Sequence, residues 1–306
     1  MYTSEQIRQI YARLGLSVPG SLTPDRKNLF QLQQAFLMTV PYENLDILAG
    51  IPLSLSEDAL FDKLVTRRRG GYCFEINGFF AVLLRSIGYT VTEYLARYLR
   101  GETAIPMRRH RVLRVTANDG SEWIVDAGIG QESFRQPLPY GDTNAETDDG
   151  FRVYRLRRRD FYGWVIEDHL TCQACSTCRA CSTSQACSTS QACSTSQACS
   201  TSQACSTSQA CAAEAEPDAD KPVFRPFYSF TEEPQLPCDY EMPSFWCEKH
   251  PDSPFTKAPM LAIRTPRGRI AIDGDQLSCY EDGAVQRRNF TKEEYPALLR
   301  QYFGIR

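Results

Sequence analysis

The residue with the clearest potential for chemistry is Cys73, which follows the pair Gly70-Gly71 and stands at the start of a segment with an apolar stripe. The spacing predicts a helix over residues 74–87, closed by Gly88. A thiol at a helix start faces the positive end of the helix dipole and the free backbone N–H groups of the first turn. Both favour the thiolate, which is the nucleophilic form of cysteine. Cys73 is therefore a candidate nucleophile.

A partner base is easy to search for, because the chain has only three histidines. His110 directly precedes a strand expected at 111–116, and Asp126 directly follows one expected at 123–125. The sequence Asn-Asp-Gly at 118–120 predicts a hairpin between these strands. The other two histidines fit the role of base poorly, since one borders a repetitive tract and one lies in a polar loop: His169 and His250.

This hairpin brings an imidazole and a carboxylate within reach of each other, because facing residues on paired strands have Cβ atoms about 4.5–5.5 Å apart. The imidazole of His110 can then take the thiol proton of Cys73, while Asp126 fixes the imidazole tautomer and stabilises its cation. Each residue alone has an ordinary structural interpretation. The three together predict a Cys-His-Asp catalytic triad.

The remaining elements divide the chain into helices followed by strands. Before residue 88, capping residues at Thr3, Thr23 and Ser56 predict three more helices. After residue 88, the apolar period changes to that of strands, expected at 91–99, 111–116, 123–125, 151–156, 164–167 and 224–230, with a hairpin formed by 260–264 and 270–272. Thr291, with Glu294, predicts the cap of a final helix over 291–302.

Composition excludes several classes of protein. A net charge of −3 and a pI near 5.8 argue against a nucleic-acid-binding protein. Three basic runs, at 67–69, 108–111 and 155–159, are either solvated surface or a site that attracts an anionic cofactor. Neither a secretory signal nor an apolar run of membrane-spanning length is evident, so we expect a cytoplasmic protein in which thiols stay reduced.

Nine of the thirteen cysteines lie in one tract between 172 and 211, which includes five perfect copies of Cys-Ser-Thr-Ser-Gln-Ala. A repeat without an apolar face cannot offset chain entropy, so a disordered insertion over about 171–221 is the simplest interpretation. Two alternatives stay open. One is a zinc site at Cys172, Cys175, Cys178 and Cys181, and the other is a small β-solenoid with stacked cysteines.

At four places the chain resembles the arylamine N-acetyltransferases: PYENL at 41–45, RGGYC at 69–73, His110 with DAGIG at 126–130, and HPDSPF at 250–255. The resemblance implies an α+β fold with a cysteine-protease-like arrangement of Cys, His and Asp. Its expected parts are an N-terminal helical bundle (1–88), a central β-barrel (89–232) and a C-terminal α/β lid (233–306). The cysteine-rich insertion at about 171–221 is expected to interrupt the barrel range, where relatives have a short or unrelated connection.

The implied reaction is a ping-pong transfer of an acetyl or other short acyl group, malonyl for example, from acyl-CoA through a Cys73 thioester to an arylamine or hydrazine, as in xenobiotic detoxification. CoA is a co-substrate, and neither a permanent cofactor nor a catalytic metal is expected. The resemblance further implies that Gly128, Gly130 and Thr265 contact CoA. Glu43 and Arg69 match a pair that forms a buried ion bridge in the family.

Two other interpretations of the triad stay open. The first is a transglutaminase-like or papain-like Cys-His-Asp hydrolase, which would act on a peptide or amide without CoA. The second is a non-catalytic binding protein whose cysteine tract holds a metal. Neither a nucleic acid nor a membrane is expected as a partner.

Overall fold

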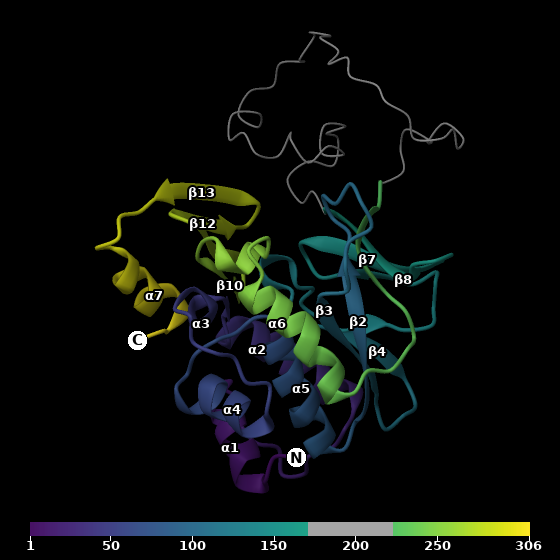
Figure 1. Cartoon of the computed structure of the whole chain (residues 1–306). Coiled ribbons are helices and arrows are strands. Elements are labelled where there is room, and N and C mark those ends of the chain that lie inside the picture. The colour runs from purple at the N-terminus through teal and green to yellow at the C-terminus, as the bar shows by residue number, and fades with distance from the viewer. Residues whose placement is uncertain (171–222) are drawn as a thin grey trace, which may run out of the picture.

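A computed structural model describes residues 1–170 and 223–306 of the chain (Figure 1). Within the described residues, the helices lie before Gly88 and after Leu236, apart from one short turn at 130–132. These helices are α1 (Ser4–Arg13), α2 (Arg26–Thr39), α3 (Leu45–Leu48), α4 (Glu57–Phe61), α5 (Cys73–Ile87), α6 (Glu241–Lys249) and α7 (Tyr295–Phe303), with the π-helical turn η1 (Asp62–Thr66) and the 3-10 turns η2 (Gly130–Glu132), η5 (Pro237–Tyr240) and η6 (Pro254–Thr256).

Near the N-terminus, two of the three predicted helix caps are confirmed and one is wrong. At α1 the predicted capping box is present, and Ser56 caps α4 as predicted. The start predicted at Thr23 is wrong, because Asp25 caps α2 and its carboxylate accepts the N–H of Asn28 at 2.8 Å. Aspartate is the better N-cap residue of the two.

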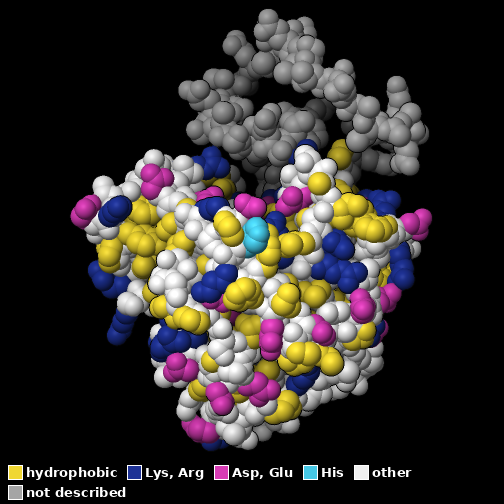
Figure 2. Space-filling view, in the orientation of Figure 1, with side chains coloured by type: hydrophobic (Ala, Val, Ile, Leu, Met, Phe, Trp, Pro, Cys, Tyr) yellow, Lys and Arg dark blue, Asp and Glu magenta, His cyan; other side chains and the backbone are white. Residues whose placement is uncertain are grey.

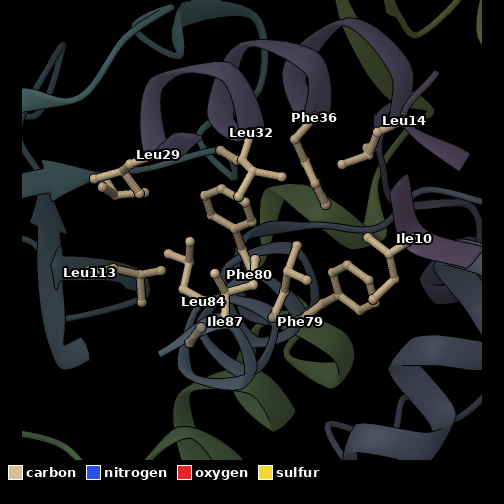
Figure 3. Packing of buried hydrophobic residues seen from close by; sticks show 14 of the residues in the cluster. Ile10, Leu14, Leu29, Leu32, Phe36, Phe79, Phe80, Leu84, Ile87 and Leu113 are labelled. Atoms are coloured by element: carbon tan, nitrogen blue, oxygen red, sulfur yellow. The ribbon is translucent and has the colours of Figure 1, made fainter. Parts of the chain in front are cut away.

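Helix α5 is the centre of the helical part, and its apolar face is buried against α1 and α2 (Figure 3). Phe79 and Phe80 of α5 lie beside Phe36 of α2, with ring centroids 5.9 and 5.2 Å from that ring. Leu113, from the barrel, belongs to the same buried cluster. Each such side chain contributes about 1.5–3 kcal/mol by its burial, so the helix that begins with Cys73 is held firmly against the barrel.

Eight antiparallel strands form the barrel, in the order β5-β4-β3-β2-β9-β8-β7-β6. Strand β5, at one end of this order, packs against β7 near the other end, so the sheet curls into a nearly closed barrel. All the strands predicted between 91 and 230 are present, and two short ones were missed, β5 and β6. Their bounds are β2 (Thr90–Tyr98), β3 (His110–Thr116), β4 (Glu122–Val125), β5 (Leu138–Pro139), β6 (Glu146–Asp148), β7 (Arg152–Arg159), β8 (Gly163–Leu170) and β9 (Arg225–Phe230).

The second sheet has five antiparallel strands: β1 (Tyr42–Glu43), β10 (Met260–Thr265), β11 (Gly268–Asp273), β12 (Gln276–Glu281) and β13 (Ala284–Asn289). The β10–β11 hairpin was predicted, whereas β12, β13 and α6 were missed. Strand β1 comes from the N-terminal half of the chain and pairs with β10. Together with the helices and the barrel, this sheet gives the α+β fold that was predicted.

The predicted start of the last helix is wrong. Helix α7 begins at Tyr295, although the carboxylate of Glu294 does accept the N–H of Thr291 at 2.9 Å, as half of a capping box would. The reason is Pro296, which has no N–H. In the second position of α7 it loses no hydrogen bond, whereas a helix capped by Thr291 would place it in the interior.

The cysteine-rich tract lies outside the described residues, so the three interpretations of it stay open. The tract joins β8 to β9, which pair with each other, so it enters between two barrel strands. The division of the chain at 88 and 232 stays a prediction.

Basic side chains do not gather into one area on the face shown in Figure 2, where acidic side chains lie among them. The basic runs have acidic partners within the chain: Arg67 pairs with Asp62 at 2.8 Å and Arg155 with Glu167 at 2.8 Å. This pairing favours a structural role for these arginines over an anion site. Within residues 1–170 and 223–306, no helix has the length and apolar character needed to cross a membrane.

Candidate active site

Cys73 is the first residue of α5, and the loop before it can only be built with glycine. A Cβ atom on Gly70 would lie 1.9 Å from the carbonyl oxygen of Pro41, and one on Gly71 would lie 2.7 Å from Oε2 of Glu75. The loop also pairs with the PYENL segment, since Glu43 donates its N–H to the carbonyl of Gly71 at 2.8 Å. Two of the motifs found in the sequence therefore form one unit that fixes the start of α5.

His110 and Asp126 are brought together by the hairpin of β3 and β4, as predicted. Leu113 pairs with Val125 in the register of this hairpin, which places His110 diagonally opposite Asp126. Nε2 of His110 lies 2.6 Å from Oδ2 of Asp126, and both side chains are buried. The ring of Tyr228, from β9, packs edge-on against the imidazole with centroids 5.2 Å apart.

The same hairpin reaches the start of α5. Sγ of Cys73 lies 3.8 Å from the carbonyl oxygen of Arg109, the residue before His110. On the other strand, a Cβ atom on Gly128 would lie 2.9 Å from Cα of Cys73, so the chain passes directly over the cysteine two residues after Asp126. The three residues of the predicted triad thus meet at the first turn of α5.

The expectation that the helix start makes Cys73 acidic is wrong for the folded chain. Burial, above all, and the nearby thiol of Cys247 raise the pKa of Cys73 well above its usual value. The backbone N–H groups of Arg111 and Phe74 act in the opposite direction but do not outweigh burial. A thiol in this position needs a base to take its proton, and His110 follows the very residue that Sγ contacts.

Two further groups near the thiol were not found in the sequence. Cys247, from α6, belongs to the same buried cluster as Cys73, and burial raises its pKa to about 12. Tyr42 packs against that cluster, and burial first, then Cys73, raises the pKa of its phenol well above the usual value. Cys247 lies 174 residues further along, so local pattern carries no sign of the contact.

A buried network of charges supports the loop from below. Arg69 donates to Glu43 at 2.8 Å, which confirms the predicted ion bridge, and to Asp46 at 2.9 Å. Lys63 extends it by pairing with Asp46 at 2.8 Å and with Glu75 at 2.7 Å. Lys63 was missed because its local sequence looks like that of a lysine on the exposed face of a helix. The network contacts the backbone on both sides of Gly70-Gly71, so its role is to hold the loop.

Comparisons with known proteins agree with this geometry. The model of the N-acetyltransferase family matches residues 25–306. The chain belongs to the arylamine N-acetyltransferase family. It is 29% identical to the arylamine N-acetyltransferase of Mycolicibacterium smegmatis over 91% of this chain and 83% of that protein.

Solved structures of this family have the same fold. The arylamine N-acetyltransferase from Salmonella typhimurium superposes with a TM-score of 0.77 at 25% identity, over 99% of this chain and 92% of that one. The Mycobacterium marinum arylamine N-acetyltransferase in complex with CoA gives a TM-score of 0.75 at 24% identity, over 98% and 92%. The second likeness concerns the fold alone.

The residues that the family resemblance assigns to CoA lie on two segments that contact each other. Gly130 has a φ of +78°, and a Cβ atom there would lie 3.2 Å from the ring of Tyr42. Thr265 ends β10, and its carbonyl accepts a hydrogen bond of 2.5 Å from Arg135, which follows the Gly130 loop. Gly128, Gly130 and Thr265 are thus connected through one loop–hairpin junction, and their contact with CoA stays a prediction.

Among residues 1–170 and 223–306, no group of three or more His, Cys, Asp or Glu side chains could hold a metal ion. The proposed zinc ligands at 172–181 lie outside these residues. The two other histidines have partners of their own: His250 stacks on Trp246 with centroids 4.7 Å apart, and His169 packs edge-on against Phe224 at 4.6 Å.

Proposed function

We propose that this chain is an acyl-CoA-dependent arylamine N-acetyltransferase that works through an acyl thioester on Cys73. The observation that carries the proposal is the meeting of three elements at one point: the start of α5 with Cys73, and the two strands that hold the His110–Asp126 pair at 2.6 Å. Family membership indicates the class of reaction. The buried thiol of Cys73 and the oriented imidazole of His110 are the nucleophile and the base that this reaction needs.

In the first half-reaction, His110 takes the proton of Cys73, and the thiolate attacks the carbonyl carbon of the acyl-CoA thioester. The tetrahedral oxyanion is met by backbone N–H groups at the helix start, that of Cys73 among them. The C–S bond to CoA then breaks, and the CoA sulfur leaves with the proton held by His110. Asp126 stabilises the imidazolium while it exists.

In the second half-reaction, the nitrogen of an arylamine or hydrazine attacks the acyl-cysteine. His110 removes a proton from that nitrogen and returns it to the sulfur of Cys73 as the C–S bond breaks. Acetyl, propionyl and malonyl thioesters all satisfy this chemistry, with Gly128, Gly130 and Thr265 as the proposed CoA contacts. A cytoplasmic location belongs to the proposal, because the reaction requires Cys73 to stay reduced.

Intact-protein mass spectrometry tests the acyl-enzyme directly. The protein is incubated separately with acetyl-, propionyl- and malonyl-CoA, and the variants Cys73→Ala and Cys238→Ala are treated alike. Cys238 is an exposed free thiol, so its removal is the matched control. We expect one acyl adduct on the wild type and on Cys238→Ala, none on Cys73→Ala, and loss of the adduct when an arylamine is added.

An adduct on Cys73→Ala, or none on the wild type with any donor, would contradict the proposal. A hydrolase of the transglutaminase-like or papain-like kind gives a different result: it cleaves a peptide or amide in the absence of CoA. Of the two reactions, acyl transfer and hydrolysis, family membership favours acyl transfer. A binding protein with an inert triad would show no adduct and no preference of iodoacetamide for Cys73 over Cys238.

A further inference from the structure

Asn77 lies one turn after Cys73 on α5 and has no exposed surface. Its side-chain amide makes three hydrogen bonds, and each goes to the hairpin that carries the candidate base. Nδ2 donates to Oδ1 of Asp126 at 2.9 Å and to the carbonyl of Arg111 at 2.6 Å, while Oδ1 accepts the N–H of Ala127 at 3.0 Å.

The orientation of this amide is fixed by its partners. The carbonyl of Arg111 can only accept a hydrogen bond, and the N–H of Ala127 can only donate one. Turning the amide over would therefore break both bonds and would leave these buried polar groups unsatisfied. Nδ2 is thus held facing Asp126.

This bond determines which oxygen of Asp126 is left for His110. Oδ1 accepts from Nδ2 of Asn77 at 2.9 Å and from the N–H of Gly128 at 2.9 Å. Oδ2 is the oxygen that lies 2.6 Å from Nε2 of His110. With one oxygen held by two donors, the carboxylate cannot rotate about its last torsion, so the imidazole is presented with one ring orientation.

Asn77 also joins two elements that the reaction needs in register. Cys73 and Asn77 are four residues apart, so their side chains lie on the same face of α5. The amide contacts both strands of the hairpin at that face, on either side of Asp126 and His110. It therefore sets the distance between the helix of the nucleophile and the strands of the base.

We propose that Asn77 is a positioning residue: its amide holds Asp126 in the rotamer that orients His110 toward Cys73. The proposal rests on the pairing of Cys73 with His110 in the proposed function, but not on the identity of the acyl donor. A purely structural role would make Asn77 matter for stability and leave the reactivity of the thiol unchanged. The two roles can be separated by experiment.

The test measures the rate at which iodoacetamide alkylates Cys73 as a function of pH, with the site identified by peptide mass spectrometry and without CoA. Asn77→Leu removes the amide and keeps the branched shape of the side chain. The matched control is Gln33→Met, because Gln33 is also fully buried and its amide donates to a carbonyl, that of Phe134, at 2.9 Å. His110→Gln gives the profile of a thiol without its base.

We expect Asn77→Leu to lower the alkylation rate near neutral pH at least about tenfold and to give the profile of His110→Gln. Gln33→Met should keep the wild-type profile even where it lowers the melting temperature as much. If Asn77→Leu does not fold, Asn77→Ala removes the amide without adding a charge beside Asp126 and carries the same test. The other titratable groups around Cys73 and His110 are unchanged in these variants: Asp126, Cys247, Tyr42, Tyr72 and Tyr228.

A wild-type profile in folded Asn77→Leu, or in folded Asn77→Ala, would overturn the proposal. So would a wild-type profile identical to that of His110→Gln, because Asn77 would then have no oriented base to support. Failure of the proposed function looks different. In that case acetyl-CoA forms no adduct, yet alkylation of Cys73 still depends on His110 and on Asn77.

Discussion

Glu75 allows a quantitative test of the charge network beneath the active-site loop. It lies on α5 two residues after Cys73, and its side chain is 3% exposed. Oε1 accepts from Lys63 at 2.7 Å, and Oε2 accepts the N–H of Tyr72 at 3.2 Å. Burial raises the pKa of Glu75 from 4.5 to about 7, although Lys63 acts to lower it. The perturbation is Glu75→Gln, which keeps the shape and removes the titration.

The sign follows from the raised pKa. The folded protein binds the Glu75 proton more tightly than the unfolded chain, so the resulting stabilisation is complete below about pH 4.5 and is lost as the pH rises through about 7. A pKa shift of one unit corresponds to about 1.4 kcal/mol, so the shift of Glu75 from 4.5 to about 7 corresponds to a loss of about 3 kcal/mol. Glutamine does not titrate. Relative to the wild type, the free energy of unfolding of Glu75→Gln should therefore increase by about 3 kcal/mol between pH 4.5 and pH 8.

In Glu75→Gln, Lys63 loses one of its two partners. This loss changes the free energy of unfolding by the same amount at every pH in the range. Lys63 keeps Asp46 at 2.8 Å, and the carboxylates around it raise its pKa, so its charge does not change in this range. Urea unfolding followed by tryptophan fluorescence at several pH values measures the difference. Glu241→Gln, at an exposed position in the first turn of α6, is the control. Parallel curves for wild type and Glu75→Gln would show that Glu75 does not titrate with a raised pKa in the folded protein.

Three further outcomes follow from the site. Arg69→Met leaves Glu43 and Asp46 without their shared cation and should cost about 3–5 kcal/mol of stability; an unchanged urea midpoint would contradict a buried bridge. Gly128→Ala places a Cβ atom 2.9 Å from Cα of Cys73, so it should lower the melting temperature and reduce kcat/KM for acetyl-CoA by about 10²-fold in the folded fraction; full activity would show that the loop can move away. Asp126→Asn keeps the size but removes the charge beside His110 and should reduce kcat/KM by about 10²–10⁴-fold; near-normal steady-state kinetics would exclude the orienting role.

The candidate site could be found in the sequence because its three residues stand at the ends of regular elements. Cys73 begins a helix, His110 begins a strand, and Asp126 follows one. Capping, glycine and hairpin signals mark such ends locally, and a hairpin then brings two of the residues together. Asn77 was missed, although one signal was available: it is a polar residue in an apolar stretch, four positions after Cys73.

Errors in the fold came from competition between neighbouring signals. Thr23 and Asp25 both qualify as caps, and the carboxylate prevails. At the C-terminus, Thr291 and Glu294 form half of a capping box, but Pro296 requires a later start. Strand β1 was not predicted because two residues carry no period, and its partner β10 lies over 200 positions away.

Residue types and local patterns were enough to predict which groups are available for chemistry and which elements carry them: a thiol at a helix start, and an imidazole and a carboxylate on one hairpin. The electrostatic state of these groups depends on how the folded chain packs around them. Burial raises the pKa of Cys73 against the local effect of its helix, because desolvation depends on everything packed around the sulfur, including Cys247. The identity and position of the reactive groups can be predicted from local sequence, whereas their pKa values depend on the complete packing of the folded chain.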